Sequence, residues 1–208
     1  MKNKIHEPSY SSALLEGSLD QIENRVESRI FNAGRSDSDL SSVRFSECIF
    51  RNISFRGNMS DCLFEDITFD HCDLSNCNVS ESVFRRAKFD TCRMMGTDLT
   101  HSLFTDVIFN NCQCAYINLN ESKWKNASVQ NSIMCEGSLS MCAMDNVLFE
   151  HTDFSECEFA HTKLKDIDLS SCELDGFAVT PEDLKGVIVN EEQAVACAKL
   201  LGIVVKNE

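Results

Sequence analysis

Apolar residues recur at every fifth position over most of this 208-residue chain. The series is unbroken from Phe64 to Val179. Residues 40–55 keep the same five-residue spacing, but their series is offset by one position because Met59 follows Phe55 after only four residues. Twelve of the 14 phenylalanines occupy these central positions. A period of five residues fits neither the 3.6-residue period of an α-helix nor the two-residue period of a β-strand. The pattern predicts a chain that turns a corner every five residues, with four corners closing one square coil.

A second, smaller position lies two residues before each central one. It is never charged and is nearly always small, as at Cys72, Ser82, Ala87 and Thr97. One large and one small inward residue on each side would fill a narrow shaft at the density of a solid interior.

The five-residue unit is similar to that of the pentapeptide-repeat family, whose consensus is A(D/N)LXX. The units Cys72-Asp73-Leu74-Ser75-Asn76, Thr97-Asp98-Leu99-Thr100-His101 and Thr152-Asp153-Phe154-Ser155-Glu156 carry the resemblance. It implies an all-β solenoid, a right-handed quadrilateral β-helix over residues 38–181. About seven coils at the strand spacing of a sheet would make a shaft roughly 35 Å long. Residues 1–37 are expected to form a cap or an irregular first coil, since Ile30 fits the upstream frame and Arg35 does not.

The cysteines are expected to be buried and reduced. Nine of the 12 cysteines occupy the small inward position and Cys114 occupies a central one. They suit small buried side chains in a reducing, cytoplasmic compartment, without disulfides. The alternative is a metal or redox ladder formed by Cys72, Cys92 and Cys112 on one side of successive coils, but no ligand set converges as a CxxC pair would.

No motif for catalysis or cofactor binding is present. The five histidines are spread over different sides and coils, so they give no nucleophile–base pair. No metalloprotease motif, phosphate loop or nucleophile elbow occurs, and no cofactor or metal is expected. No run of about 18 apolar residues could cross a membrane. The start of the chain lacks the apolar stretch of a secretory signal. A non-catalytic protein is predicted.

Charge is distributed unevenly around the predicted coil. Lys and Arg number 19 and Asp and Glu number 33, for a formal net charge of −14, which disfavours direct binding to nucleic acid or anionic lipid. Two adjacent sides carry most of the acids of the repeat region and a single cation, Arg93. This acidic face is either a solubility feature or a surface that competes with DNA for a basic groove. Its candidate partner-binding residues are Asp61, Glu81, Asp98, Glu121 and Glu158 on one side and Asp73, Glu136, Asp153 and Glu156 on the other.

The last 27 residues, 182–208, are predicted to cap the solenoid. Asn190 and Gln193 fit a capping box, Gly202 ends the predicted helix, and residues 203–205 are predicted to form a short strand. The helix either caps the last coil only or also dimerises. The candidate dimer residues are Ala194, Cys197, Ala198, Leu200, Leu201 and Ile203.

Residues 186–194 and 200–203 resemble the C-terminal end of Qnr-type pentapeptide-repeat proteins. That resemblance implies a tail-to-tail homodimer that binds DNA gyrase or topoisomerase IV as a DNA mimic and protects it from quinolones. The sequence departs from the Qnr pattern because no loop interrupts the period between Phe64 and Val179. The alternative hypothesis is a structural protein-interaction scaffold with another partner.

Overall fold

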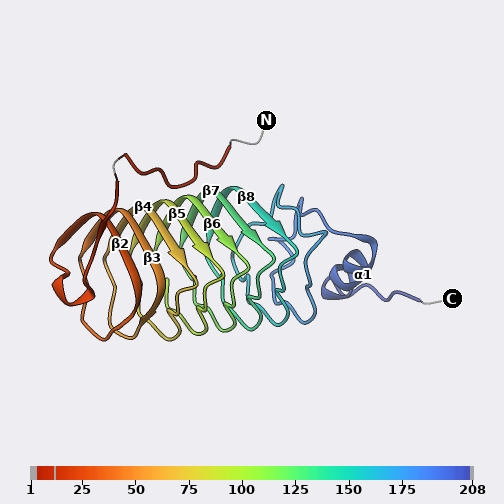
Figure 1. Ribbon diagram of the computed structural model, residues 1–208. Coiled ribbons are helices and arrows are strands. Elements are labelled where there is room, and N and C mark those ends of the chain that lie inside the picture. Colours follow the sequence, from red (N-terminus) through yellow and green to blue (C-terminus); the bar gives the residue numbers. More distant parts are fainter. Residues whose placement is uncertain (1–3, 12, 207–208) are drawn as a thin grey trace.

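The computed structural model describes residues 4–11 and 13–206, which form a β-solenoid with one helix at its C-terminal end (Figure 1). One parallel sheet contains eight strands in chain order. The strands are β1 (Leu15–Glu16), β2 (Arg25–Ser36), β3 (Arg44–Phe55), β4 (Leu63–Asp70), β5 (Val83–Asp90), β6 (Leu103–Asn110), β7 (Lys123–Gln130) and β8 (Ala143–Glu150). A 3-10 helix, η1, spans Leu19–Gln21, and the helix α1 spans Glu191–Leu200. The predicted all-β solenoid with a C-terminal helix is confirmed.

The predicted central residues fill the shaft. All of them are buried except Met144 and Val179, which are partly exposed. Phenylalanines of successive coils stack face to face, as in the pair Phe69–Phe89, whose ring centroids are 4.9 Å apart, and the pair Phe89–Phe109, at 4.7 Å. These separations match the spacing of neighbouring strands, so the rings follow the backbone ladder.

The small inward position has a hydrogen-bonding role that its size alone did not indicate. Its thiols and hydroxyls donate to the carbonyl of a central residue one coil earlier. Cys62 Sγ donates to the Leu40 carbonyl at 3.0 Å, and Thr97 Oγ1 donates to the Leu74 carbonyl at 2.9 Å. Cysteine, serine and threonine therefore serve there as small side chains that also link adjacent coils.

Each corner has a residue in the left-handed backbone conformation, two positions after the central residue. The φ values at Asp61, His71, Asn76 and Glu81 lie between 54° and 59°, and the same conformation recurs along the chain. Asn, Asp and His tolerate this region better than other non-glycine residues, which explains why they are frequent at the corners.

The first coil begins earlier than the sequence indicated. β2 pairs in parallel register with β3 from Arg25 to Ser36, and its inward residues are Val26, Phe31 and Ser36. The frame suggested by Ile30 is wrong, because that side chain is only half-buried. A second four-residue step, from Ser36 to Leu40, and a polar residue at an inward position hid this coil from the periodicity. The division of the chain at residues 37 and 181 stays a prediction.

An N-terminal segment, residues 4–11, lies along one corner of the solenoid from β6 back to β3 (Figure 1). His6 Nδ1 lies 3.3 Å from an Asp106 carboxylate oxygen. The Ser9 amide donates to Asp66 at 3.0 Å, and the Ser11 hydroxyl donates to Glu47 at 2.7 Å. Sequence reasoning missed this strap, because it has no repeat of its own.

Helix α1 covers the last coil, as predicted. Asn190 and Gln193 form the expected capping box. The buried amide of Gln193 donates to the carbonyls of Leu169, at 2.9 Å, and Cys172, at 2.7 Å, so it closes the open backbone edge. Gly202 follows the helix with φ +76°, as a C-terminal cap requires. The strand predicted at residues 203–205 is wrong: this segment is exposed, and a strand needs a neighbouring strand that the single chain does not supply there.

Candidate recognition surface

Three of the candidate acids occupy one column of corners along the rod. Asp61, Glu81 and Glu121 are exposed and adopt the left-handed conformation. The column also contains His101, whose Nδ1 lies 3.6 Å from a Glu121 oxygen, and Met141. The acidic column is therefore interrupted at these two coils.

Three aspartates of the predicted face have a structural role in their own turns. The carboxylates of Asp73, Asp98 and Asp153 accept the backbone N–H of the residue two positions later, at 2.9 to 3.0 Å. Such Asx turns are a local reason for Asp or Asn at this repeat position. These three carboxylates therefore stabilise their own turns in addition to carrying charge.

Asp73 also forms the strongest ion pair on this face. The Arg56 guanidinium donates to its carboxylate at 2.6 Å, and the Ser75 amide donates to it at 3.0 Å. Burial alone would raise the pKa of Asp73, but these contacts outweigh it and lower the pKa to about 2. The charge of Asp73 is thus partly neutralised by Arg56.

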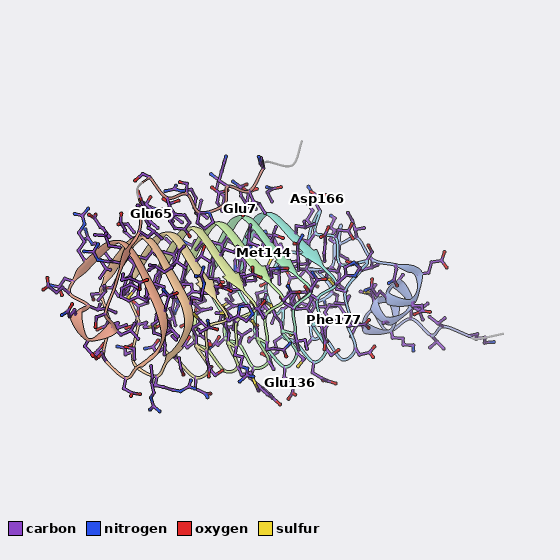
Figure 2. The ribbon with its side chains drawn as sticks, viewed as in Figure 1. Glu7, Glu65, Glu136, Met144, Asp166 and Phe177 are labelled. Carbon is purple, nitrogen blue, oxygen red and sulfur yellow. The ribbon has the colours of Figure 1, made fainter. Side chains whose placement is uncertain are left out.

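The remaining glutamates are the most available anions of the face. Glu136, Glu156 and Glu158 are all exposed, and Glu136 lies at the outer edge of the solenoid (Figure 2). Glu136 accepts the Tyr116 hydroxyl at 2.8 Å, which raises the pKa of Tyr116. The accessible surface is therefore a set of separated carboxylates rather than a continuous stripe.

The candidate dimer residues lie at the C-terminal end. Leu200, Leu201 and Ile203 are 44%, 53% and 54% exposed. Ala194 is also exposed, and Ala198 is half-buried. Cys197 packs against the core, so it contributes to capping. The other five residues form or border an apolar patch that the single chain leaves open.

The cysteines lie where the sequence placed them. Cys72, Cys92 and Cys112 stack inside the shaft, and burial raises the pKa of the Cys62 and Cys157 thiols to about 12. No group of three His, Cys, Asp or Glu residues suited to a metal occurs among residues 4–11 and 13–206. Within the same residues, no helix is long and apolar enough to cross a membrane.

Comparisons with known proteins agree with the repeat geometry. A family model described as the pentapeptide repeat region matches residues 62–136. No curated protein sequence matches the chain significantly.

Several solved structures are similar to this chain. Full-length QnrB1, a plasmid-mediated fluoroquinolone resistance protein, is 18% identical, with 92% of this chain and 95% of that chain covered and a TM-score of 0.38. A trypsin-treated QnrB1 variant is 19% identical, with coverages of 88% and 92% and a TM-score of 0.40. HetL, a pentapeptide repeat protein involved in heterocyst differentiation regulation in the cyanobacterium Nostoc, is 12% identical, with coverages of 80% and 90% and a TM-score of 0.32.

The matched segment covers the coils from β4 to β7, and the same buried centres and left-handed corners continue on both sides of it. Residues 62–136 are a pentapeptide repeat region by this match.

Proposed function

We propose that this protein is a non-catalytic binding protein whose exposed glutamates mimic the phosphates of DNA toward a type II topoisomerase, DNA gyrase or topoisomerase IV. The partner class comes from the resemblance of residues 186–194 and 200–203 to the Qnr-type C-terminal end. The proposal places the protein in the cytoplasm, where its many thiols stay reduced.

The supporting observation is the presence of glutamate at left-handed corners. Glu81, Glu121, Glu136 and Glu156 have φ values between 55° and 59°. A non-glycine residue in this region costs on the order of 1–3 kcal/mol, and glutamate lacks the local hydrogen bonds by which Asn and Asp offset that cost. The backbone conformation therefore gives no preference for glutamate at these corners. An anionic surface that a basic groove recognises does explain it.

The test is a charge-reversal variant that spares the aspartates of the Asx turns. Glu81, Glu121, Glu136 and Glu158 change to Lys in one protein. The control reverses four exposed acids elsewhere: Glu7, Glu23, Asp145 and Glu182. Both proteins acquire the same net charge, so only the position of the charges differs.

The assay is supercoiling by purified gyrase, with and without a quinolone, at several salt concentrations. Wild-type protein and the control should change gyrase activity, and the acidic-face variant should lose at least ten-fold in potency. Rising salt should weaken the wild-type effect, because exposed charges are screened within about 8–10 Å. No effect of the wild-type protein at large molar excess would reject the topoisomerase partner. Equal potency of the two variants would reject the acidic face.

We further propose that the apolar C-terminal patch is the contact of a homodimer. Exposed Leu200, Leu201 and Ile203 lie at the C-terminal end of α1, which follows the last coil of the solenoid (Figure 1). Sedimentation should give a dimer for the wild-type protein and a monomer for Leu201→Glu combined with Ile203→Glu. A wild-type monomer at high concentration would reject the dimer.

A further inference from the structure

An exposed apolar strip, formed by Met95, Ala115, Tyr116 and Cys135, lies on three successive coils within the acidic face. The Gly96 amide donates to the Ala115 carbonyl at 2.9 Å. The Tyr116 amide donates to the Cys135 carbonyl, also at 2.9 Å, so the three coils are adjacent at this point. Met95 is 45% exposed and Tyr116 is 53% exposed, while Ala115 and Cys135 are half-buried. Two large side chains of the strip therefore remain in contact with solvent.

Tyr116 is the aromatic member of the strip, and it occupies a corner where a bulky side chain is uncommon. Its φ is 61°, in the left-handed region that Asn, Asp and glycine adopt more readily. Its hydroxyl donates to the Glu136 carboxylate at 2.8 Å, which directs the ring toward the next coil. The backbone conformation gives no preference for an aromatic residue here, and the ring is largely exposed. Tyrosine and methionine are both enriched at protein interfaces, so the strip has the composition of a contact surface.

The charge on this surface changes sign along the rod. Arg93 is exposed at the N-terminal end of the strip, two residues before Met95. At the other end Glu136, Glu156 and Asp175 are exposed on three successive coils. The Glu156 amide donates to the Asp175 carbonyl at 2.7 Å, so the last two of these coils are adjacent. The surface thus passes from a cation through apolar side chains to a group of carboxylates, and a complementary partner has the opposite charges in the same order.

The spacing of the coils favours a helical partner. The stacked phenylalanine rings of successive coils are 4.7 and 4.9 Å apart. An α-helix presents one face with a pitch of about 5.4 Å, whereas an extended strand repeats its side chains on one face every ~6.6–6.8 Å. A helix that lies parallel to the rod therefore places successive turns over successive coils. The coils of Arg93 and Asp175 are four steps apart, about 19 Å, which a helix of about 13 residues spans.

We propose that the apolar strip anchors an amphipathic helix of the partner protein. Apolar side chains of the helix pack on Met95 and Tyr116, and its basic side chains meet Glu136 and Glu156. The inference rests on the proposed function because it uses the same acidic face, and it adds an apolar anchor that phosphate mimicry does not require. Aromatic side chains near the centre of an interface carry much of its binding energy, whereas the surrounding charges set the orientation and the association rate. Arg93 fixes the direction of the helix, because an acidic residue in the first turn faces it.

The first test uses a fluorescein-labelled, alanine-based helical peptide, with binding measured by fluorescence anisotropy. The peptide has a glutamate in its first turn, leucines on one face in the middle and two lysines in its last turn. Its control has the same composition and the same terminal charges, but its leucines are spread around the helix. The first peptide should bind at least ten-fold more tightly than the control, with equal helicity of the two shown by circular dichroism. Equal binding, or no binding of either peptide, would overturn the apolar anchor.

The second test changes the protein without changing its charge. Met95→Ser with Tyr116→Ser should weaken binding of the first peptide at least ten-fold. The control, Leu103→Ser with Met141→Ser, removes two apolar side chains outside the strip that are 40% and 53% exposed, and it should stay within two-fold of wild type. Thermal melts should show that both variants are folded. Equal affinities of the two variants would show that the peptide binds elsewhere and would overturn the strip as its site.

Two further measurements separate this inference from its alternatives. In the gyrase supercoiling assay, Met95→Ser with Tyr116→Ser should lose at least ten-fold in potency. Full potency of this variant, together with a loss for the charge-reversal variant of the acidic face, would overturn the strip and leave the proposed function standing. If the wild-type protein does not affect gyrase, the topoisomerase partner fails, and the peptide measurements still decide the strip. Sedimentation tests a second copy of the chain as the occupant: conversion of a dimer into a monomer by Met95→Ser with Tyr116→Ser would overturn the partner helix.

Discussion

The stacked phenylalanines provide the most direct test of the shaft. Phe109 is 0% exposed, and its ring stacks on Phe89 with centroids 4.7 Å apart and an interplanar angle of 7°. It also meets Phe104 edge to face at 6.0 Å and Trp124 at 5.8 Å. Phe109→Ala removes all these contacts from the middle of the rod, where no chain end can relax to fill the space. Leu103→Ala is the matched control, because Leu103 lies on the same strand and is 40% exposed.

The magnitude follows from burial and stacking. Replacing a buried phenylalanine by alanine costs about 3–5 kcal/mol through lost transfer free energy and the cavity left behind. Aromatic pairs contribute about 0.5–1.5 kcal/mol each beyond the area they bury, so the upper part of that range applies. A loss of about 4 kcal/mol corresponds to a drop of roughly 8–16 °C in the melting midpoint of a chain of this size. Leu103→Ala should cost less than about 1 kcal/mol, because Leu103 is already 40% exposed in the folded protein and its loss leaves no closed cavity.

The assay is thermal and urea unfolding followed by circular dichroism, with both variants at equal concentration. Urea midpoints are compared at a common slope, so that a change in the amount of surface exposed is detected separately. A loss below about 1.5 kcal/mol for Phe109→Ala, or equal losses for the two variants, would contradict the packing of the phenylalanines described here.

Two further predictions concern polar groups. The Thr162 hydroxyl accepts a hydrogen bond from the Cys142 amide at 2.9 Å and donates one to the Leu139 carbonyl. Thr162→Val should therefore lower the free energy of unfolding, measured in urea, by about 1–3 kcal/mol, and Thr162→Ser should lower it clearly less. Equal losses would show that the methyl group of Thr162 matters more than its hydroxyl. The pKa of Asp73 is lowered to about 2 in the folded protein, so its charge stabilises the fold above the ordinary pKa and this contribution disappears as pH falls toward 2. The wild-type protein should therefore have a higher free energy of unfolding than Asp73→Asn at pH 6, and the two values should converge near pH 2. A difference that stays constant with pH would mean that the ion pair with Arg56 is not the source of the stabilisation.

Most of the fold could be predicted from the sequence because the shaft restricts two positions in every five residues. Large side chains such as Phe64 and small ones such as Ser82 must alternate inward, and no other architecture requires that spacing. The register of the first coil was missed because Ser36 is polar at an inward position and because the four-residue step from Ser36 to Leu40 shifts the frame. A periodicity search finds only coils whose inward residues keep the same five-residue spacing.

The candidate site was less predictable, because outward positions have several reasons for the same residue type. Asp98 and Asp153 accept backbone amides in turns, whereas Glu81 and Glu136 do not have this role. A count of charges around the coil treats these residues alike. The end of the sheet after β8 gave no signal in the sequence. Leu164 and Leu169 keep the five-residue period, although the backbone between them forms a turn instead of a strand.

The strap and the end of the sheet after β8 together divide the rod into parts of unequal stability. Coils of a solenoid contact only their neighbours, so cohesion is the sum of the interfaces between adjacent coils. From β3 to β6 each interface has its ladder and is also crossed by the strap, through the contacts of Ser11 with Glu47 and of His6 with Asp106. The interface after β8 lies beyond these strap contacts, and the strands of the sheet end there. Local opening should therefore begin there and release α1 with the last coils, while the coils under the strap remain folded.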